Sequence, residues 1–436
     1  MDKEENQFLS IRKAMEKGSG EVSVRGWVHR ERGSNKIKFI VLRDSTNIIQ
    51  CVIEKAVVGE EEFEVVKKLQ VEASITITGE IKKDDRAPSG YEISVKNFEI
   101  IGKSDTYPIT KDQSPEFLLD NRHLWIRSRK MIAMLKIRST VSGAIHKFFR
   151  KKGYHEFNAP ILQPNQCEGG STLFEVKYYD SKTYLSQSWQ LYAEAGIFGL
   201  EKIYNFGPTF RAEKSKTSRH LSEFWMAEME AAWLKLPEVI EIAKEEIKFI
   251  IKEVVENNEQ ELKFLNQDIE KLTKMISKHW PTITYKEALK ILKEKENMEV
   301  EYGKDLRTIE EEKIMKHFDV PIIVTNYPKE IMAFYKPEDQ NNIGTALCFD
   351  MLAPDGYGEI IGGSQRETSL EKLKEELKKE DENIENYDWY LDLRKYGSVP
   401  HSGYGVGVER IIAWITGAEN IKETIPFPRT LIRKSP

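Results

Sequence analysis

Alternating apolar and polar positions between residues 22 and 100 predict five β-strands. The runs are rich in β-branched residues and are separated by turn residues: VSVRGWVHR, KFIVLRD, NIIQCVIEK, ASITITGEI and YEISVKNFEI. A helical stretch at residues 60–69 interrupts them before the fourth run. Five short strands with one helix suggest an OB-fold barrel, a frame that commonly binds single-stranded nucleic acid.

Beyond the barrel the pattern changes. Residues 104–126 are polar and irregular with two prolines, which predicts a hinge between a first domain, 1–103, and a second, 127–436. From Ile126 to Lys152 the apolar positions follow helical spacing, and Gly153 ends the run. The strand YHEFNAPIL follows, entering Pro160. Residues 236–302 read as a largely helical insertion whose Lys and Glu residues face solvent.

The stretch from Tyr204 to Trp233 predicts strand, loop, strand. Its loop is too long and too charged for a tight turn. The stretch contains five basic side chains that could donate hydrogen bonds to phosphate oxygens: Arg211, Lys214, Lys216, Arg219 and His220. It also contains four acids that could bind amines or a metal ion: Glu213, Glu223, Glu228 and Glu230. The loop lacks the spacing of a glycine-rich P-loop, so an ordinary solvated basic loop stays an equal alternative from the residues alone.

Two later runs carry further chemistry. In YGEIIGGSQRE, Glu359 precedes two glycines and Arg366, and we expect Asp350 to lie upstream on a neighbouring part of the same strand. Two carboxylates near phosphates would bind Mg²⁺, although carboxylates on strands are more often structural. In HSGYGVGVER, glycines precede Arg410 with a spacing that matches neither the dinucleotide fingerprint nor a Walker A motif.

Composition narrows the class of protein. At 436 residues, 40% hydrophobic and 31% charged, the chain fits a soluble globular protein of two or more domains. No run approaches the length of a membrane span and the start is charged, so we expect neither membrane insertion nor secretion. Three distant cysteines predict no zinc site or disulfide framework, which favours the cytoplasm.

A net charge of -5 argues against general polyanion binding. The local distribution of charge matters more than this sum, because salt screens charges over about 10 Å. Six basic residues and one acidic residue lie between Arg25 and Arg43, interleaved with Trp27 and Phe39. This combination can hold a phosphate backbone while a base stacks. The alternative is a solvated strand face with Phe39 in the core, and composition alone favours it.

The order FRAE, RHLSEF and E-x-E closely resembles the second signature motif of the class II aminoacyl-tRNA synthetases, as found in the aspartyl and asparaginyl enzymes. RGWVHR, FIVLRD and IIQCVIE are similar to their anticodon-binding barrel, and HSGYGVGVER looks like their third motif. The resemblance runs from about Val22 to Pro428. It implies an α+β fold: an OB-fold barrel followed by a catalytic domain with an antiparallel sheet flanked by helices. It also implies a homodimer formed through residues 126–160.

The resemblance implies roles for individual residues. ATP would be bound by Arg211, Glu213, Arg219, His220, Leu221, Phe224, Glu359, Gly407 and Arg410. Arg211, Glu359 and Arg410 would be catalytic, and Asp350 and Glu359 would hold Mg²⁺. The anticodon would be bound by Arg25, Arg30, Phe39 and Gln50, with Phe39 stacking on its central base.

The amino-acid pocket would contain Glu168, Ser188, Gln190, Ala193, Arg211, Glu228, Ser364 and Arg366. Aspartyl enzymes typically read QSPQLxK, and QSWQLYAE here places Ala193 where their lysine stands. A cation missing from a buried pocket disfavours an anionic guest, so we expect asparagine, with Arg366 donating to its carbonyl. The ending PFPRT also resembles asparaginyl enzymes. Trp189 departs from the usual proline.

The expected reaction activates asparagine with ATP, giving asparaginyl-adenylate and pyrophosphate, and then transfers the asparaginyl group to the 3′ end of tRNA(Asn) in the cytoplasm. The closest alternative is an aspartyl enzyme, including one that charges both tRNAs. Another is a paralogue that makes asparagine, for which an anticodon-type barrel would serve no purpose. A non-catalytic RNA-binding protein is disfavoured because Arg211, Glu359, Arg366 and Arg410 occur together.

Overall fold

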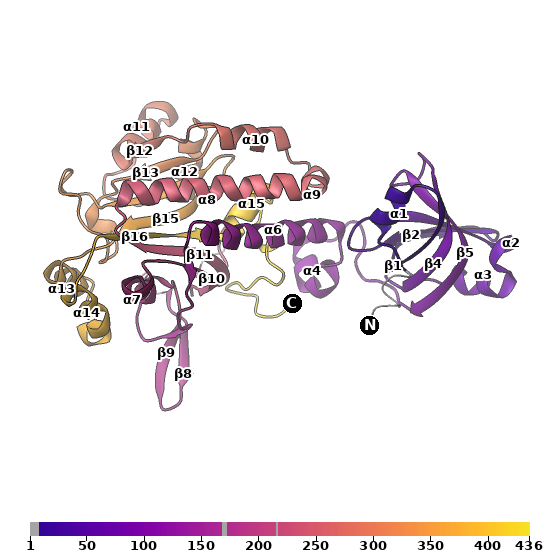
Figure 1. The fold of residues 1–436 in the computed structure, drawn as a ribbon, viewed down its shortest axis with the longest axis horizontal. Coiled ribbons are helices and arrows are strands. Elements are labelled where there is room, and N and C mark those ends of the chain that lie inside the picture. The colour runs from indigo at the N-terminus through magenta and orange to yellow at the C-terminus, as the bar shows by residue number, and fades with distance from the viewer. Residues whose placement is uncertain (1–7, 168–171, 215–216) are drawn as a thin grey trace. The chain divides into compact units, whose positions relative to one another are not determined.

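The computed structural model describes residues 8–167, 172–214 and 217–436. The chain divides into two compact units, residues 1–118 and 119–436 (Figure 1). Along the described residues, no helix combines the length and apolarity needed to cross a bilayer. The predicted boundaries at 103 and 127 lie on either side of the division.

The first unit is a closed five-stranded barrel in the order β1-β2-β3-β5-β4. Its strands are β1 (Gly20–Gly33), β2 (Ile37–Arg43), β3 (Ile48–Glu54), β4 (Ser74–Lys83) and β5 (Tyr91–Gly102). The helices α2 (Lys55–Val58) and α3 (Glu60–Lys67) lie between β3 and β4, as predicted for residues 60–69. The OB-fold prediction is confirmed. A further helix, α1 (Ile11–Lys17), begins where the Ser10 side chain accepts from the Lys13 amide.

An eight-stranded sheet forms the second unit, in the order β12-β13-β14-β15-β16-β11-β10-β6. The strands are β6 (His155–Glu156), β10 (Lys202–Phe210), β11 (Glu223–Ala232), β12 (Thr282–Thr284), β13 (Ile322–Thr325), β14 (Cys348–Ala353), β15 (Gly358–Gln365) and β16 (His401–Gly407). Neighbours from β13 to β10 are antiparallel, as expected. Within this sheet, the edge pairs β12–β13 and β6–β10 are the parallel ones among the described strands.

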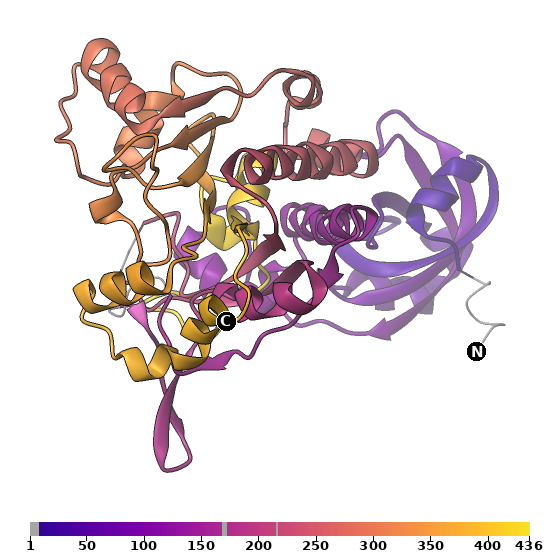
Figure 2. The same ribbon diagram turned by 60° about the vertical axis from the view of Figure 1, so that its left-hand side comes forward.

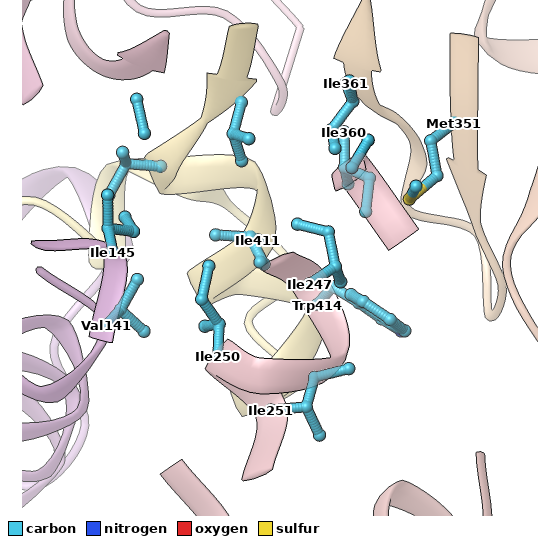
Figure 3. Close-up of a cluster of buried hydrophobic side chains, with 14 of the residues drawn as sticks. Val141, Ile145, Ile247, Ile250, Ile251, Met351, Ile360, Ile361, Ile411 and Trp414 are labelled. Atoms are coloured by element: carbon cyan, nitrogen blue, oxygen red, sulfur yellow. The ribbon is translucent and has the colours of Figure 1, made fainter. Parts of the chain in front are cut away.

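Among the helices that pack against this sheet are α6 (Arg129–Lys151), α8 (Leu236–Asn257) and α15 (Val408–Thr416). Figure 3 shows the apolar side chains that meet there, from α6, α8, α15 and the strands β14 and β15. Ile145, Ile250 and Ile411 are completely buried. The helical spacing of apolar residues therefore marks the faces that cover the sheet.

The predicted insertion at 236–302 is helical but not peripheral. It comprises α8, α9 (Glu259–Phe264), α10 (Ile269–Ser277), the sheet strand β12 and α11 (Tyr285–Glu296). Val239, Ile247 and Val254 of α8 are fully buried in the same core as the sheet. α8 is therefore part of the core of the second unit, and α12 (Thr308–Met315) follows α11 before β13.

The predicted hinge at 104–126 is only partly irregular. Its second half forms α4 (Pro115–Asp120) and α5 (Arg122–Trp125). Arg122 is buried and donates to the carbonyl oxygens of Pro426 at 2.7 Å and Ile425 at 2.5 Å. These bonds tie α5 to the end of the same unit, a contact that local composition does not reveal.

The remaining elements surround one end of the large sheet. A three-stranded sheet comprises β7 (Leu162–Gln163), β8 (Glu175–Tyr178) and β9 (Ser181–Leu185). β8 and β9 form a hairpin that projects from the unit, as both views show (Figure 2). β9 leads into α7 (Gln190–Leu200), which packs beside α14 (Asp388–Lys395), and α13 (Leu370–Lys379) completes this group.

Candidate active site

A cavity of about 1200 Å³, part of it open to solvent, lies over the centre of the large sheet. Its walls come from neighbouring strands: Phe224, Met226, Glu228 and Glu230 of β11, Glu359, Gly362 and Gly363 of β15, and Tyr404, Gly405 and Gly407 of β16. Every second residue of β11 lines it, because side chains alternate across a strand. Gly362 pairs with Gly405, so bare backbone forms part of the floor.

The β10–β11 hairpin carries Arg211 and Phe224 to the same end of the cavity. Thr209 pairs with Phe224 across the hairpin, and Arg211 follows directly after β10. The Arg211 guanidinium carbon lies 5.5 Å from the centre of the Phe224 ring. Arg211 Nε is buried and, among the described residues, has no hydrogen-bond partner. An unsatisfied buried donor beside an aromatic face suits an anionic ligand that carries a planar ring.

Two carboxylates converge beside Gly362: Asp350 lies on β14 and Glu359 on the antiparallel neighbour β15, so the prediction that they share one strand is wrong. A Cβ atom on Gly362 would lie 3.3 Å from Glu359 Oε1 and 3.6 Å from Asp350 Oδ1. Burial and the charge of Glu359 raise the pKa of Asp350 to about 8. Burial also acts to raise the pKa of Glu359, but Arg410 lowers it overall, and Arg410 Nη1 donates to Glu359 Oε2 at 2.9 Å. Lys336 lines the cavity and lowers both values electrostatically.

This pair of acids fits a divalent cation. Like charges held close together disfavour ionisation of both, and a cation relieves that repulsion. Magnesium is usually bound by one or two carboxylates together with substrate phosphates. The described residues contain no cluster of three or more potential metal-binding side chains, so a cation here would need ligand oxygens as well.

Basic side chains from the hairpin loop lie around the cavity mouth. Arg219 donates to Glu312 Oε1 at 2.8 Å and pairs with Glu311 at 3.4 Å. His220 lines the cavity 3.5 Å from Glu213. Burial, followed by the charge of Arg410, lowers the pKa of His220, so the neutral ring is favoured near neutral pH.

Glu228, Gln190 and Ser188 line another part of the cavity. Ser188 Oγ donates to Glu228 Oε1 at 2.6 Å, and the Trp189 amide donates to Oε2 at 3.2 Å. Gln190 begins α7 and lines the same wall. Trp189 anchors this turn through its indole, which donates to the Phe157 carbonyl at 2.7 Å.

Arg366 reaches the cavity just after β15 and is only 4% exposed. Its Nη2 donates to Glu230 Oε2 at 2.8 Å, its Nε donates to Oε1 at 3.1 Å, and its Nη1 donates to Ser364 Oγ at 2.7 Å. A guanidinium has five N–H groups, so two remain for a ligand beyond these contacts with described residues. Its positive charge is already paired with Glu230, which favours a neutral guest over an anionic one.

The barrel places the four predicted anticodon residues on one face. Cross-strand pairing of Arg30 with Val41, and of Val41 with Gln50, puts these side chains on the face that Phe39 also shares. Arg25 lies on the same face of β1, ahead of a bulge. Phe39 is half-buried, whereas Gln50 is 6% exposed and donates to Glu92 Oε2 at 3.1 Å.

Comparison with known proteins decides the family. A model of class II tRNA synthetases (D, K and N) matches residues 114–431, and an OB-fold nucleic acid binding domain matches residues 22–101. An asparagine–tRNA ligase of Thermoplasma acidophilum is 46% identical over 98% of this chain and 100% of its own length. The chain belongs to the asparagine–tRNA ligase family of class II synthetases.

Solved structures agree with this assignment. Asparaginyl-tRNA synthetase from Pyrococcus horikoshii, complexed with asparaginyl-adenylate, superposes with a TM-score of 0.93 at 45% identity over 97% of both chains. The enzyme from Entamoeba histolytica in complex with asparaginyl-adenylate has a TM-score of 0.88 at 29% identity, covering 98% of this chain and 99% of the other. The OB-fold and the class II catalytic domain were thus both predicted correctly.

Most residues predicted from the synthetase motifs line the cavity, and two of the described ones, Ala193 and Ser364, do not. Ala193 is fully buried in an apolar cluster with Trp189 and Ile197. Ser364 is buried behind Arg366 and supports it rather than facing the space. Glu168 lies outside the described residues. The roles of all predicted residues remain predictions.

Sequence reasoning missed other parts of this synthetase site. Tyr335 and Lys336 line the cavity from an irregular segment that showed no periodicity. Glu230 was noted as one of several acids, but not as the partner of Arg366. Glu194 is buried behind Gln190. Nothing in the sequence marked it as part of the site except its position directly after Ala193. A buried acid is recognisable only when its partners are known, and they come from distant segments.

Proposed function

We propose that this chain activates asparagine with ATP and transfers the asparaginyl group to tRNA(Asn). The asparagine carboxylate attacks the α-phosphate, which releases pyrophosphate and forms asparaginyl-adenylate. The 3′-terminal ribose hydroxyl of the tRNA then attacks the carbonyl carbon of the adenylate, and AMP leaves. No covalent intermediate with the enzyme is required. The main observation behind this proposal is that Arg211, Arg410 and Arg366 all line one cavity in a chain of this family.

At the nucleotide end, catalysis rests on position and charge. Arg211, with its unsatisfied Nε, is suited to bridge the α-phosphate and the attacking carboxylate. Phe224 offers its ring to adenine, and Glu213 lies near His220 at the same end. Arg219, His220 and Arg410 line the cavity and would bind the terminal phosphates, and Leu221 and Gly407 also line it.

Asp350 and Glu359 would hold Mg²⁺ when the nucleotide is bound. The ion would supply positive charge to the phosphate oxygens. Glu359 also accepts from Arg410 and thereby fixes that arginine relative to the phosphates. Gly362 leaves the space between the two carboxylates open.

At the amino-acid end, Glu228 and Gln190 present acceptors to the α-ammonium group, and Arg366 donates to the side-chain carbonyl. Glu230 already neutralises Arg366, and α7 supplies Ala193 rather than a lysine. An aspartate carboxylate would therefore meet no unpaired cation, either from Arg366 or from position 193. The free energy lost when that carboxylate leaves water would not be offset by an ion pair. This pairing supports asparagine as the substrate.

The OB-fold face carrying Phe39 and Gln50 would bind the anticodon of tRNA(Asn). We also propose a cytoplasmic homodimer formed through residues 126–160. Ile161 and Leu162 directly after this segment are each 43% exposed, which supports an interface there. A mass by light scattering close to twice the chain's 50.6 kDa would agree with the dimer, and a monomeric mass would refute it.

Charging of purified tRNA tests the function. The protein, ATP and Mg²⁺ are incubated with labelled asparagine or aspartate and with tRNA(Asn) or tRNA(Asp). We expect label only on tRNA(Asn) and only from asparagine. Aspartate on both tRNAs would identify a non-discriminating aspartyl enzyme. Free asparagine formed from aspartate and ammonia would identify the biosynthetic alternative.

A further inference from the structure

A buried glutamate behind the amino-acid pocket accepts hydrogen bonds from four side chains. Glu194 on α7 has no exposed surface. Its Oε1 accepts from Gln190 Nε2 at 3.0 Å. Its Oε2 accepts from the Tyr390 hydroxyl at 2.8 Å and from Arg394 Nη2, and lies 3.0 Å from His401 Nε2. One carboxylate therefore joins α7, α14 and the start of β16.

Glu194 is ionised in the folded protein. Burial alone would raise the pKa of its carboxyl, but Arg394 and His401 lower that pKa below its ordinary value. His401 Nδ1 lies 2.7 Å from the Val399 carbonyl oxygen, so both ring nitrogens of His401 lie beside acceptor oxygens. Neutralising Glu194 would leave the buried Arg394 guanidinium without its counter-ion, which is strongly unfavourable.

The first consequence concerns Gln190. A carboxylate only accepts hydrogen bonds, so the NH₂ group of the Gln190 amide must face Glu194. The amide oxygen is then the atom left for the cavity, which Gln190 lines. An oxygen is the acceptor that a substrate ammonium group requires. Without Glu194, the amide would be free to turn and present a donor instead.

The second consequence concerns Arg366. The backbone N–H of Arg366 donates to the His401 carbonyl at 2.9 Å. Arg394 Nε donates to the carbonyl of Glu367, the next residue, at 2.9 Å. Arg394 and His401, the two residues whose side chains meet Glu194 Oε2 from α14 and β16, therefore fix the backbone on both sides of the Arg366 side chain.

We propose that Glu194 is a positioning residue for amino-acid binding, acting without contact to the substrate. It orients the Gln190 amide and fixes the backbone from which Arg366 reaches the side chain of the amino acid. This inference rests on the proposed function. Its hydrogen bonds do not reach Arg211, so the nucleotide end of the cavity is independent of it.

The test is ATP–pyrophosphate exchange with the Glu194→Gln variant of the full chain. We expect the KM for asparagine to rise at least tenfold while the KM for ATP stays within twofold of wild type. A purely structural role would lower kcat through loss of folded protein and leave both KM values unchanged. The matched control is Glu310→Gln, because Glu310 is 1% exposed and pairs with Arg307 on α12, away from this network.

Coupling to Gln190 makes the test sharper. In the double variant Glu194→Gln with Gln190→Ala, we expect the KM for asparagine to rise less than the product of the two single effects. Effects that simply multiply would show that Glu194 does not act through Gln190 and would overturn that half of the proposal. An unchanged KM for asparagine in folded Glu194→Gln would overturn all of it.

If Glu194→Gln does not fold, Tyr390→Phe replaces it, since this variant removes one donor and keeps the charges. We then expect a two- to fivefold rise in the KM for asparagine alone, and no rise would overturn the proposal. Failure of the proposed function has a different signature, because the wild-type protein itself would then show no exchange with asparagine.

Discussion

Gly403 holds open the space in which Arg366 and Glu230 pair, so Gly403→Ala should damage amino-acid binding. Gly403 lies directly across from Glu230 in the β11–β16 ladder. A Cβ atom there would lie 2.0 Å from Glu230 Oε2 and 2.3 Å from the Met229 carbonyl oxygen. Both distances are more than 1 Å shorter than an ordinary van der Waals contact. We expect the Glu230 carboxylate to move away from Arg366, because the second clash is with backbone, which cannot turn aside as a flexible side chain can.

The size of the effect follows from the contacts that are lost. A hydrogen bond between charged groups contributes about 1.5–3 kcal/mol, and about 1.4 kcal/mol corresponds to a tenfold change in binding. We therefore expect the KM for asparagine to rise about 10- to 150-fold, if Arg366 loses one such bond to its partner or to the ligand. Crowding of the sheet should also lower stability by about 1–3 kcal/mol.

The assay is ATP–pyrophosphate exchange at varied asparagine, with thermal unfolding of the same preparations. Gly199→Ala is the matched control, because it makes the same chemical change on α7 where no atom lies within 4 Å of the added Cβ. Its KM should equal that of wild type. A folded Gly403→Ala variant with a KM for asparagine within twofold of Gly199→Ala would refute the role given to the Arg366–Glu230 pair.

Three further predictions concern the rest of the molecule. Arg211→Ala should nearly abolish adenylate formation, and exchange at the normal rate would count against its role. Phe39→Ala should weaken tRNA charging with exchange intact; unchanged charging kinetics at limiting tRNA would disagree. Burial raises the pKa of Glu246 from 4.5 to about 8, so the folded state holds a proton that the unfolded state releases between these values. Stability should therefore fall by about 1.4 kcal/mol per pH unit across that window, and thermal melts of Glu246→Gln should show a smaller fall; an equal fall would contradict the assignment.

The sequence was sufficient wherever local pattern determines structure. Strand alternation predicted the barrel because residues 22–100 place apolar side chains inward at every second position. The arrangement of acids on β11 follows from the same rule, which puts Glu228 and Glu230 on one face of the strand. The order of the synthetase motifs along the chain then predicted the roles of individual residues, which residue spacing alone did not determine.

Features that depend on distant partners could not be predicted. Glu194 follows Ala193 on a short helix, and only the fold brings Arg394 and His401 to it. Arg122 lies in a polar stretch that resembles a linker, yet it binds carbonyl oxygens at the end of the chain. In both cases tertiary structure brings a distant partner to a buried charged side chain. Hydropathy along the sequence predicts such a side chain to be exposed.

Selection of asparagine over aspartate is the central claim, and ATP–pyrophosphate exchange with each amino acid tests it most directly. Both amino acids are assayed with the wild-type protein under identical ATP and Mg²⁺. We predict that kcat/KM for asparagine exceeds that for aspartate by at least 100-fold, since Arg366 is already neutralised by Glu230. Equal values, or a preference for aspartate, would contradict the account.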